Sequence, residues 1–213
     1  MAVAVTTIEA SSAACPSVLR DGMVIAGVGQ RVWAIGNLQI LGQPLLGFFC
    51  STRCPGEVIL RTYDLARALR ESGVPMIGGF HTPMEKECLA LLLRGTQSIV
   101  ICPARSIAKM RLPADWRQAV AADRLLILSP FEAKHRRPTV ELTEQRNCFV
   151  AALSARILIA HAAPKSKTEA LCLELLRQGK PVFALPHRAN DHILATGARA
   201  ATITTLCAAV ARA

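Results

Sequence analysis

The sequence predicts an α/β fold, doubly wound around a mostly parallel sheet with helices on both faces. Two observations predict it. Short apolar runs alternate with helical patterns along the chain, as in consecutive βαβ units. Runs such as 44–50 and 156–161 are apolar almost throughout, which indicates strands buried within the sheet. With 213 residues and 52% hydrophobic content, the chain is long enough for one domain with a sizeable core.

We expect residues 1–20 to form a flexible start and residues 21–213 to form a single domain. The first segment lacks the basic region and the long apolar stretch of a signal peptide. No apolar run reaches the length of a membrane span, so no membrane partner is expected. No repeat or low-complexity linker interrupts the rest.

The apolar runs predict the strands in order. They are 23–28, 31–36, 44–50, 74–78, 98–102, 124–130, 156–161 and 181–185, with a last small strand and helix in 201–213. The helical patterns predict helices between them. These are 55–73, 82–95, one or two short helices in 104–123 broken at Pro113, 141–155 and 166–179.

Start and stop signals support the helices. Pro55 suits a first helical position, and Gly73 and Gly179 suit helix ends. Thr82 with Glu85, and Ser166 with Glu169, have the spacing of capping boxes. These glutamates are therefore interpreted as capping residues, and no carboxylate pair remains for acid–base catalysis.

The charge favours a polyanionic partner. The chain has 25 Lys and Arg against 15 Asp and Glu, a formal net charge of +10. Nucleic acid, nucleotides and anionic surfaces attract such a protein, although charge alone does not choose between them.

Eight cysteines are scattered through apolar segments without a CxxC pair. This pattern argues against a zinc ribbon and against a disulfide framework. Cys50 and Cys54 form the one close pair, and no partner ligands stand beside them. We expect buried, reduced thiols in a cytoplasmic protein, with no metal and no cofactor.

Loops at the carboxyl ends of the strands are where function is expected, because ligands bind there in open α/β sheets. The loop after Cys50 delivers Ser51, Thr52 and Arg53 to the start of a helix. The planar fork of Arg53 suits phosphate. The alternative is an exposed helix start with an incidental arginine.

The segment "HAAPKSKTEA" raises an electrostatic question. Lys165 and Lys167 stand at the positive end of a helix dipole, where each costs up to about 1 kcal/mol. A bound anion would reverse that cost, and Ser166, Thr168 and the free amides would assist it. The alternative is two solvated lysines whose repulsion is screened. Local electrostatics leaves both open.

Three further loops carry candidates. Gly78 and Gly79 permit close backbone approach, and His81 follows them. Arg146 and Asn147, placed near a helix start, suit a hydrogen-bond organiser between loops. The cluster Lys134, His135, Arg136 and Arg137 is either a solvated face or a contact to phosphates. Base stacking has few candidates, namely Phe48, Phe80 and Phe131.

Signatures of enzymes are absent. The chain has no GxGxxG, GxxxxGK[ST], GxSxG or HExxH motif. We therefore expect no catalytic residues and a binding protein.

The order of motifs resembles the Rossmann-like core of the DprA/Smf DNA-processing family, roughly from Val32 to Ile203. The segments that carry the resemblance are "GNLQILGQPLLGFFCSTRCPG", "SGVPMIGGF", "EQRNCFVAALSARILIAHAAPKSKTEALCLELLRQGKPVFALP" and "NDHILATGA". It differs from the family where Cys50 replaces a glycine, where Pro83, Met84 and Glu85 replace Gly-Ile-Asp, and where Ser166-Lys167 replaces a glycine-serine pair.

The resemblance implies a protein that binds single-stranded DNA, loads RecA recombinase in natural transformation or recombination, and forms a homodimer. It implies that Ser51, Arg53, Gly79, Lys165, Ser166 and Lys167 line a phosphate pocket. An alternative is a nucleotide-binding or nucleotide-hydrolysing protein similar to the cytokinin-activating phosphoribohydrolases. The glycine-rich loop of those enzymes is missing here around Pro164–Glu169.

Overall fold

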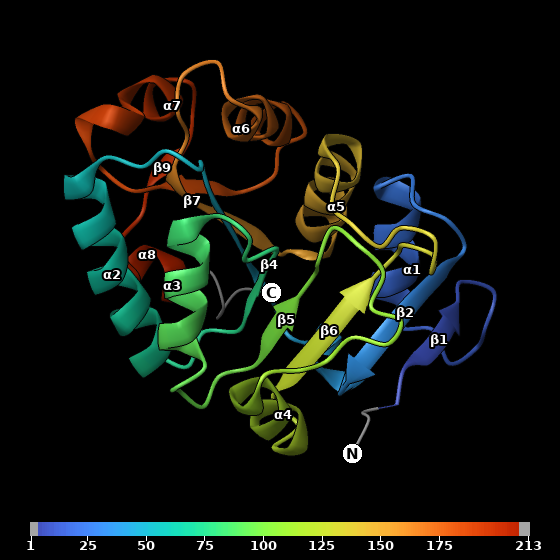
Figure 1. Cartoon of the computed structure of the whole chain (residues 1–213). Coiled ribbons are helices and arrows are strands. Elements are labelled where there is room, and N and C mark those ends of the chain that lie inside the picture. The colour runs from blue at the N-terminus through green and yellow to red at the C-terminus, as the bar shows by residue number, and fades with distance from the viewer. Residues whose placement is uncertain (1–3, 209–213) are drawn as a thin grey trace.

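The computed structural model describes residues 4–208, which build one nine-stranded sheet (Figure 1). The strand order is β1-β2-β6-β5-β4-β3-β7-β8-β9. All neighbours from β6 to β9 pair in parallel, while β2 pairs antiparallel with β1 and with β6. The strands are β1 Thr6–Glu9, β2 Arg31–Gly36, β3 Leu46–Cys50, β4 Met76–Gly78, β5 Ile99–Ile101, β6 Leu125–Ser129, β7 Arg156–His161, β8 Val182–Ala184 and β9 Arg199–Ala200.

Helices cover both faces of the sheet, which confirms the doubly wound α/β prediction. Buried residues of α1, α5, α6 and α7 pack on one face, and those of α2, α3, α4 and α8 on the other. The helices are α1 Ser17–Ile25, α2 Gly56–Glu71, α3 Pro83–Leu92, α4 Ala114–Ala121, α5 Val140–Leu153, α6 Lys167–Arg177, α7 Asp191–Ala195 and α8 Ile203–Ala208, with short 3₁₀ helices at Leu38–Gly42 and Arg188–Asn190. Residues 209–213, the end of the last predicted helix, lie outside the described residues.

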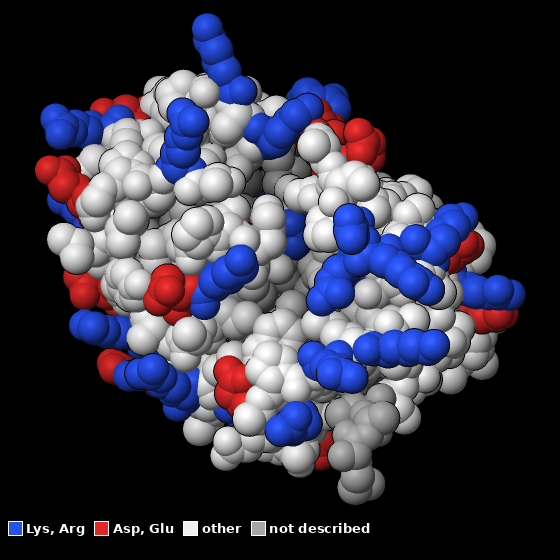
Figure 2. Space-filling model, in the orientation of Figure 1, with Lys and Arg blue, Asp and Glu red and all other residues white. Residues whose placement is uncertain are grey.

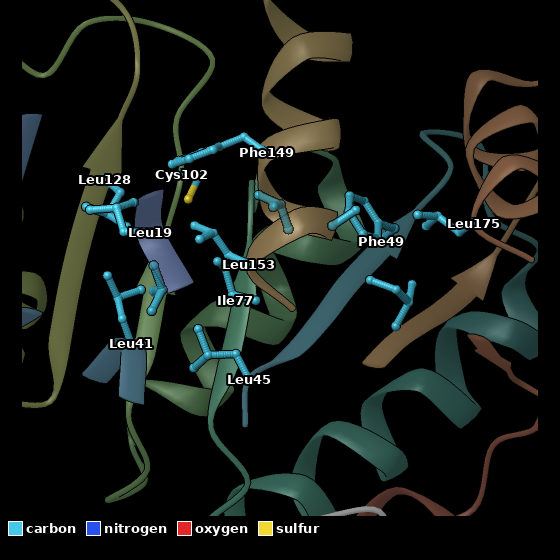
Figure 3. Packing of buried hydrophobic residues seen from close by; sticks show 14 of the residues in the cluster. Leu19, Leu41, Leu45, Phe49, Ile77, Cys102, Leu128, Phe149, Leu153 and Leu175 are labelled. Carbon is cyan, nitrogen blue, oxygen red and sulfur yellow. The ribbon is translucent and has the colours of Figure 1, made fainter. Parts of the chain in front are cut away.

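Successive side chains of each strand point to opposite faces of the sheet, which divides the core into two layers. In β3, Phe49 faces the α5 side while Phe48 faces the α2 side. Figure 3 shows the first layer, where Phe149 and Leu153 of α5 lie over Ile77 and beside Leu19 of α1. Most of these side chains are less than 5% exposed, so both faces of the central strands are buried. This explains why the runs are continuously apolar.

Local signals set most element boundaries as the sequence predicts. The Thr82–Glu85 capping box forms at the start of α3, and Gly73 and Gly179 have φ of +67° and +74° after α2 and α6. Pro55, expected at the first helical position, is instead the N-cap of α2, which begins at Gly56. At α6 only half of the box forms. The Ser166 hydroxyl accepts from the Glu169 amide, as expected. The Glu169 carboxylate, however, accepts from the amide of Lys165 and not from that of Ser166.

The N-terminal segment corrects two expectations. Within residues 1–20, expected to be flexible, Thr6–Glu9 pairs with β2 and helix α1 begins at Ser17; residues 1–3 lie outside the described part. The run 23–28, expected to be a strand, lies at the end of α1 and beyond it. Leu19 and Met23, four residues apart, are buried while Val24 and Ile25 are each 70% exposed. A short apolar run does not distinguish a helix from a strand.

The topology creates a switch point at β3. From β3 the chain proceeds through α2 to β4 on one side, and later returns through α5 to β7 on the other. The loops after β3 and β7 therefore diverge at the carboxyl edge, where a ligand site is expected. In the described residues, no helix is long and apolar enough to span a membrane.

Candidate functional site

A groove of about 320 Å³ lies at the carboxyl edge, over the switch point. The loops after β3, β4 and β7 line it together with α5, and Figure 2 shows that this face is hollowed near its centre. Its lining is Phe49, Cys50, Ser51, Thr52, Arg53, His81, Thr82, Glu85, Thr143, Asn147, Ala163, Ser166, Lys167 and Thr168. A larger hollow of about 760 Å³ lies at the opposite edge, and no charged residue lines it.

The structure brings most of the predicted site residues together. Eight of them line the groove, namely Ser51, Thr52, Arg53, His81, Asn147, Ser166, Lys167 and Thr168. Gly78, Gly79, Arg146 and Lys165 stand outside the lining. The loops after β5 and β6 contribute no lining residue. Thr143 and Asn147 of α5 line the groove on the side of these loops.

Serine hydroxyls join the two loops that diverge at the switch point. The Ser51 amide donates to the carbonyl of His161 at 2.8 Å, and the Ser51 hydroxyl accepts from the Ala163 amide at 2.9 Å. The hydroxyls of Ser51 and Ser166 are 3.3 Å apart. These contacts hold the start of α2 close to the start of α6.

Polar donors face the groove at these helix starts. The amides of Lys167 and Thr168 open α6 and have no intrahelical acceptor; among the described residues no backbone carbonyl accepts from them. Arg53 is exposed on the loop before α2, and none of the described carboxylates forms an ion pair with it. Amides and a guanidinium are the donors that an oxyanion prefers.

Lys167 is already paired with a carboxylate. Its Nζ lies 2.7 Å from Oε1 of Glu144 on α5, and this partner raises the pKa of Lys167. The two side chains are 75% and 45% exposed, so the pair is weak and open to exchange. The sequence did not indicate Glu144, because the contact joins two helices from distant parts of the chain.

Lys165 adopts a left-handed backbone conformation with φ of +61°. Its side chain is exposed, and its amide donates to Oε2 of Glu169 at 2.6 Å. Such a conformation costs a non-glycine residue roughly 1–2 kcal/mol.

Glu85 organises the groove from below, a role that goes beyond the expected capping. The residue is 2% exposed. Oε1 accepts from the Cys50 amide at 3.0 Å, and Oε2 from the amides of His81 and Thr82 at 2.9 and 3.4 Å. Burial opposes ionisation, but His81, Arg146 and the amide bonds outweigh it and lower the pKa of Glu85. An ionised carboxylate therefore fixes two loops at once.

Arg146 is also buried, at 1% exposure, in the middle of α5 and not near its start as expected. Its guanidinium donates to the Cys102 carbonyl at 3.0 Å, to Oδ1 of Asn147 at 2.9 Å and to Nδ1 of His81 at 2.8 Å. Asn147 thus orients Arg146, which joins the ends of β4 and β5. A Cβ at Gly79 would overlap this guanidinium, so the glycine makes room for Arg146.

The contact with Arg146 fixes the tautomer of neutral His81. Arginine only donates, so Nδ1 accepts and the ring proton lies on Nε2. The side chain is 46% exposed in the groove. Neutral His81 therefore offers a donor to a ligand, while its protonated form donates from Nδ1 to Oε2 of Glu85, 3.1 Å away.

Near the groove, one residue was not predicted as part of the site, and one expectation is corrected. Asn190 is fully buried and bonds to His161, the Ala162 amide and the carbonyls of Ala160 and Leu185, which ties the ends of β7 and β8. The expected stacking residues Phe48, Phe80 and Phe131 are 2%, 5% and 3% exposed. They belong to the core and are not available to bases.

A basic surface extends beside the groove. Lys and Arg gather on the right of the face in Figure 2. The loops after β5 and β6 carry Arg105, Lys109, Arg111, Lys134, Arg136 and Arg137, and the Ser106 amide donates to the His135 carbonyl, which joins these loops. Lys134 pairs with Glu132 at 2.9 Å. In the described residues, no cluster of His, Cys, Asp and Glu has a metal-binding arrangement.

Comparison with known proteins supports one family. Residues 8–209 match the family model described as DNA recombination-mediator protein A. DNA processing protein A (DprA) from Streptococcus pneumoniae is 18% identical with a TM-score of 0.76, over 96% of this chain and 73% of that chain. DNA processing protein A from Helicobacter pylori, solved for its single-stranded DNA binding mode, is 20% identical with a TM-score of 0.76, over 98% and 96%.

A more distant likeness is to the Moco carrier protein from Chlamydomonas, which is 12% identical with a TM-score of 0.53, over 80% of this chain and 99% of that chain. No curated protein matches the chain. At these identities the solved structures show a shared fold, whereas the family model covers nearly the whole sequence.

Proposed function

The chain belongs to the DNA recombination-mediator protein A family, which confirms the resemblance seen in its sequence, and on this premise we propose that its groove binds the phosphates of single-stranded DNA. One observation carries the proposal. The starts of α2 and α6 converge on the groove and present Arg53, Ser51, Ser166 and the first amides of α6 to one small volume.

The chemistry of the groove favours backbone phosphates over bases. Its cations and amides recognise an oxyanion, and the aromatic side chains near it are buried. Phosphate contacts carry no base information. We therefore expect little sequence preference and an affinity that falls steeply with salt, by a slope of about 0.7 for each phosphate contact with a single strand.

A hydrolytic role has less support. Glu85 and Glu169 are the carboxylates that a nucleotide hydrolase would have to use here. Glu85 holds three backbone amides. Glu169 holds the Lys165 amide and lies 3.3 Å from Nε2 of His192. Both are occupied by structural contacts, so the proposal assigns no catalytic residue and no cofactor.

The test is fluorescence anisotropy with labelled oligodeoxythymidine and a duplex of equal length, each at two salt concentrations. We expect single-strand binding with a micromolar or lower dissociation constant that weakens strongly at higher salt, and weaker duplex binding. Equal binding of the duplex, or binding insensitive to salt, contradicts the proposal. A thermal-shift series with mononucleotides tests the nucleotide-binding alternative. Stabilisation by a mononucleotide, without binding of the oligonucleotide, would favour that alternative.

The family also suggests partners. We propose RecA recombinase as a partner, a homodimer as the active form and the cytoplasm as the place of action. Sedimentation with and without oligonucleotide tests the dimer. The partner is tested by the lag before DNA-dependent ATP hydrolysis by RecA, measured with and without this protein. An unchanged lag would contradict RecA as a partner but would not affect the proposal of DNA binding.

A further inference from the structure

The loop between β6 and α5 carries two arginines on the surface of the protein. Arg136 and Arg137 are both exposed, and none of the described Asp and Glu side chains forms an ion pair with either. Lys134 on the same loop is paired with Glu132 at 2.9 Å, and Glu132 is the one acidic residue in 130–139. Two guanidinium groups are therefore available to an anion.

A second basic loop is joined to this one. The loop after β5 has no acidic residue, and its cations are Arg105, Lys109 and Arg111. The Ser106 amide donates to the His135 carbonyl at 2.8 Å, which joins the two loops into the basic surface. Figure 2 shows Lys and Arg gathered beside the hollow of this face. Like charges gathered on one surface repel, and a polyanion relieves that repulsion.

Helix α5 leads from the basic surface into the groove. Thr143 lines the groove, and Thr139, the N-cap of α5, lies one helical turn earlier, about 6 Å along the axis. The Thr143 hydroxyl donates to the Thr139 carbonyl at 2.7 Å. Arg137 precedes Thr139 by two residues, which span at most about 7 Å. The backbone of Arg137 therefore lies within about 13 Å of the groove lining.

Arg146 makes a second connection between the groove and the basic surface. Its guanidinium contacts His81, which lines the groove, at 2.8 Å. It also donates to the carbonyl of Cys102, the first residue after β5, at 3.0 Å. Because Arg146 is buried, these contacts hold the start of the β5 loop against the groove. The groove and the basic surface are therefore neighbouring parts of one carboxyl edge.

We propose that single-stranded DNA leaving the groove continues over the loop between β6 and α5, where Arg136 and Arg137 hold its next phosphates. This inference rests on the proposed function, because the groove supplies the first contacts. A guanidinium binds phosphate through charge-assisted hydrogen bonds, and such contacts follow the backbone whatever the bases are. The strand runs past the first turn of α5, so the basic surface favours longer strands over shorter ones.

Anisotropy with two lengths of oligodeoxythymidine separates the groove from the loop. A strand of about five nucleotides covers the groove, and one of about twenty also reaches the loop. For Arg136→Gln/Arg137→Gln we expect roughly tenfold weaker binding of the long strand and an affinity for the short strand within about twofold of the native value. The salt slope for the long strand should fall by about 1.4, the value for two phosphate contacts.

Arg67→Gln/Arg94→Gln is the matched control, because both double variants lower the net charge from +10 to +8. Arg67 lies on α2 and Arg94 follows the end of α3, and both are exposed. Equal weakening of the long strand in the two double variants would overturn the proposal, since net charge alone would explain it. Native affinity for the long strand in Arg136→Gln/Arg137→Gln would overturn it as well.

Arg53→Ala distinguishes failure of this inference from failure of the proposed function. It should weaken both strands, because both occupy the groove. If it weakens neither, the groove does not bind DNA and the proposed function is wrong. If it weakens both while Arg136→Gln/Arg137→Gln binds them like the native chain, DNA binds in the groove alone and only the path over the loop is wrong.

A long strand with neutral methylphosphonate linkages outside its central five or so nucleotides tests the chemistry of the contacts. We expect the native protein to bind it like the short strand, because the loop then meets no phosphate charge. Binding as tight as that of the fully charged long strand would contradict phosphate contacts at Arg136 and Arg137.

Discussion

The floor and the rim of the groove use charge in opposite ways. The floor is Glu85, Arg146 and Gly79, where the two charged residues are 2% and 1% exposed and their side chains bond to backbone groups and His81. The rim is Arg53, Lys165 and Lys167, all exposed. Buried charges are costly to leave unpaired, while exposed pairs contribute little. Floor variants should therefore change stability, and rim variants should change binding.

The largest effect is expected at Gly79. In Gly79→Ala the new Cβ displaces the Arg146 guanidinium, which leaves buried partners without a donor. We expect a loss of about 3 kcal/mol in the free energy of unfolding, measured with urea. Gly56→Ala is the matched control, because a Cβ there meets no atom within 4 Å. Equal losses in both variants would contradict the packing of Arg146 against Gly79.

Glu85→Gln should have the next largest effect on stability. The neutral amide keeps one acceptor and loses the charge that three backbone amides face. We expect a loss of about 2 kcal/mol in unfolding free energy at neutral pH. Glu87→Gln, an exposed change on the same helix, is the control and should cost little.

The same carboxylate predicts the acid response. Because the pKa of Glu85 is lowered below its ordinary 4.5 in the folded protein, its contribution is present above that value and is lost as pH falls through the lower folded pKa. Urea unfolding across acidic pH should show a steeper loss for the native chain than for Glu85→Gln. Parallel curves would mean that Glu85 is not ionised in the fold.

At the rim, Arg53→Ala should weaken single-strand binding roughly tenfold and reduce the salt slope by about 0.7, with unchanged unfolding. Arg67→Ala is the control, since Arg67 is an exposed arginine on α2 whose nearest carboxylate is Asp64 at 3.8 Å. Anisotropy titrations at several salt concentrations give both quantities. If the two variants behave alike, general charge and not the groove determines binding.

Glu144→Gln should strengthen binding. The change frees Lys167 from its 2.7 Å pair, and we expect an affinity gain of about threefold. Glu141→Gln removes the same charge from the first turn of α5 and serves as the control. A gain of equal size in Glu141→Gln would show that Lys167 is not the residue released.

Lys165→Gly should have the smallest effect. Glycine accepts the φ of +61° without strain, so we expect a gain of about 0.5 kcal/mol in unfolding free energy. Lys165→Ala removes the same charge and keeps the strain. A thermal melt of both variants separates the two contributions, and greater stability of the alanine variant would contradict the strain.

Patterns local in the sequence predicted most of the fold. The strands β2 to β8 and helices α2 to α6 follow from apolar runs, caps and glycine stops, because these signals span only a few residues. The last strand, β9 at Arg199–Ala200, lies just before the segment 201–213 in which it was expected. The strand β1 and the helices α1 and α7 were missed. Thr6–Glu9 has one buried position, and α7 has five residues. Neither segment is therefore long or apolar enough to show the spacing of apolar residues typical of a strand or a helix.

The location of the groove was predictable from the sequence, but its electrostatics were not. Chain order places Ser51, His81 and Ser166 at one sheet edge, and the groove contains all three. Burial of Arg146, the three amides on Glu85 and the pairing of Lys167 with Glu144 depend on how distant elements pack. A sequence pattern gives residue types and spacing, but it does not show which charges are neutralised.

The most direct measurement is amide chemical-shift mapping of the ¹⁵N-labelled protein during titration with oligodeoxythymidine. We expect the largest shifts on Thr52, Arg53, Lys167 and Thr168, at the starts of α2 and α6. Shifts confined to the opposite edge of the sheet, or to the loops after β5 and β6, would contradict a phosphate-binding groove at the switch point.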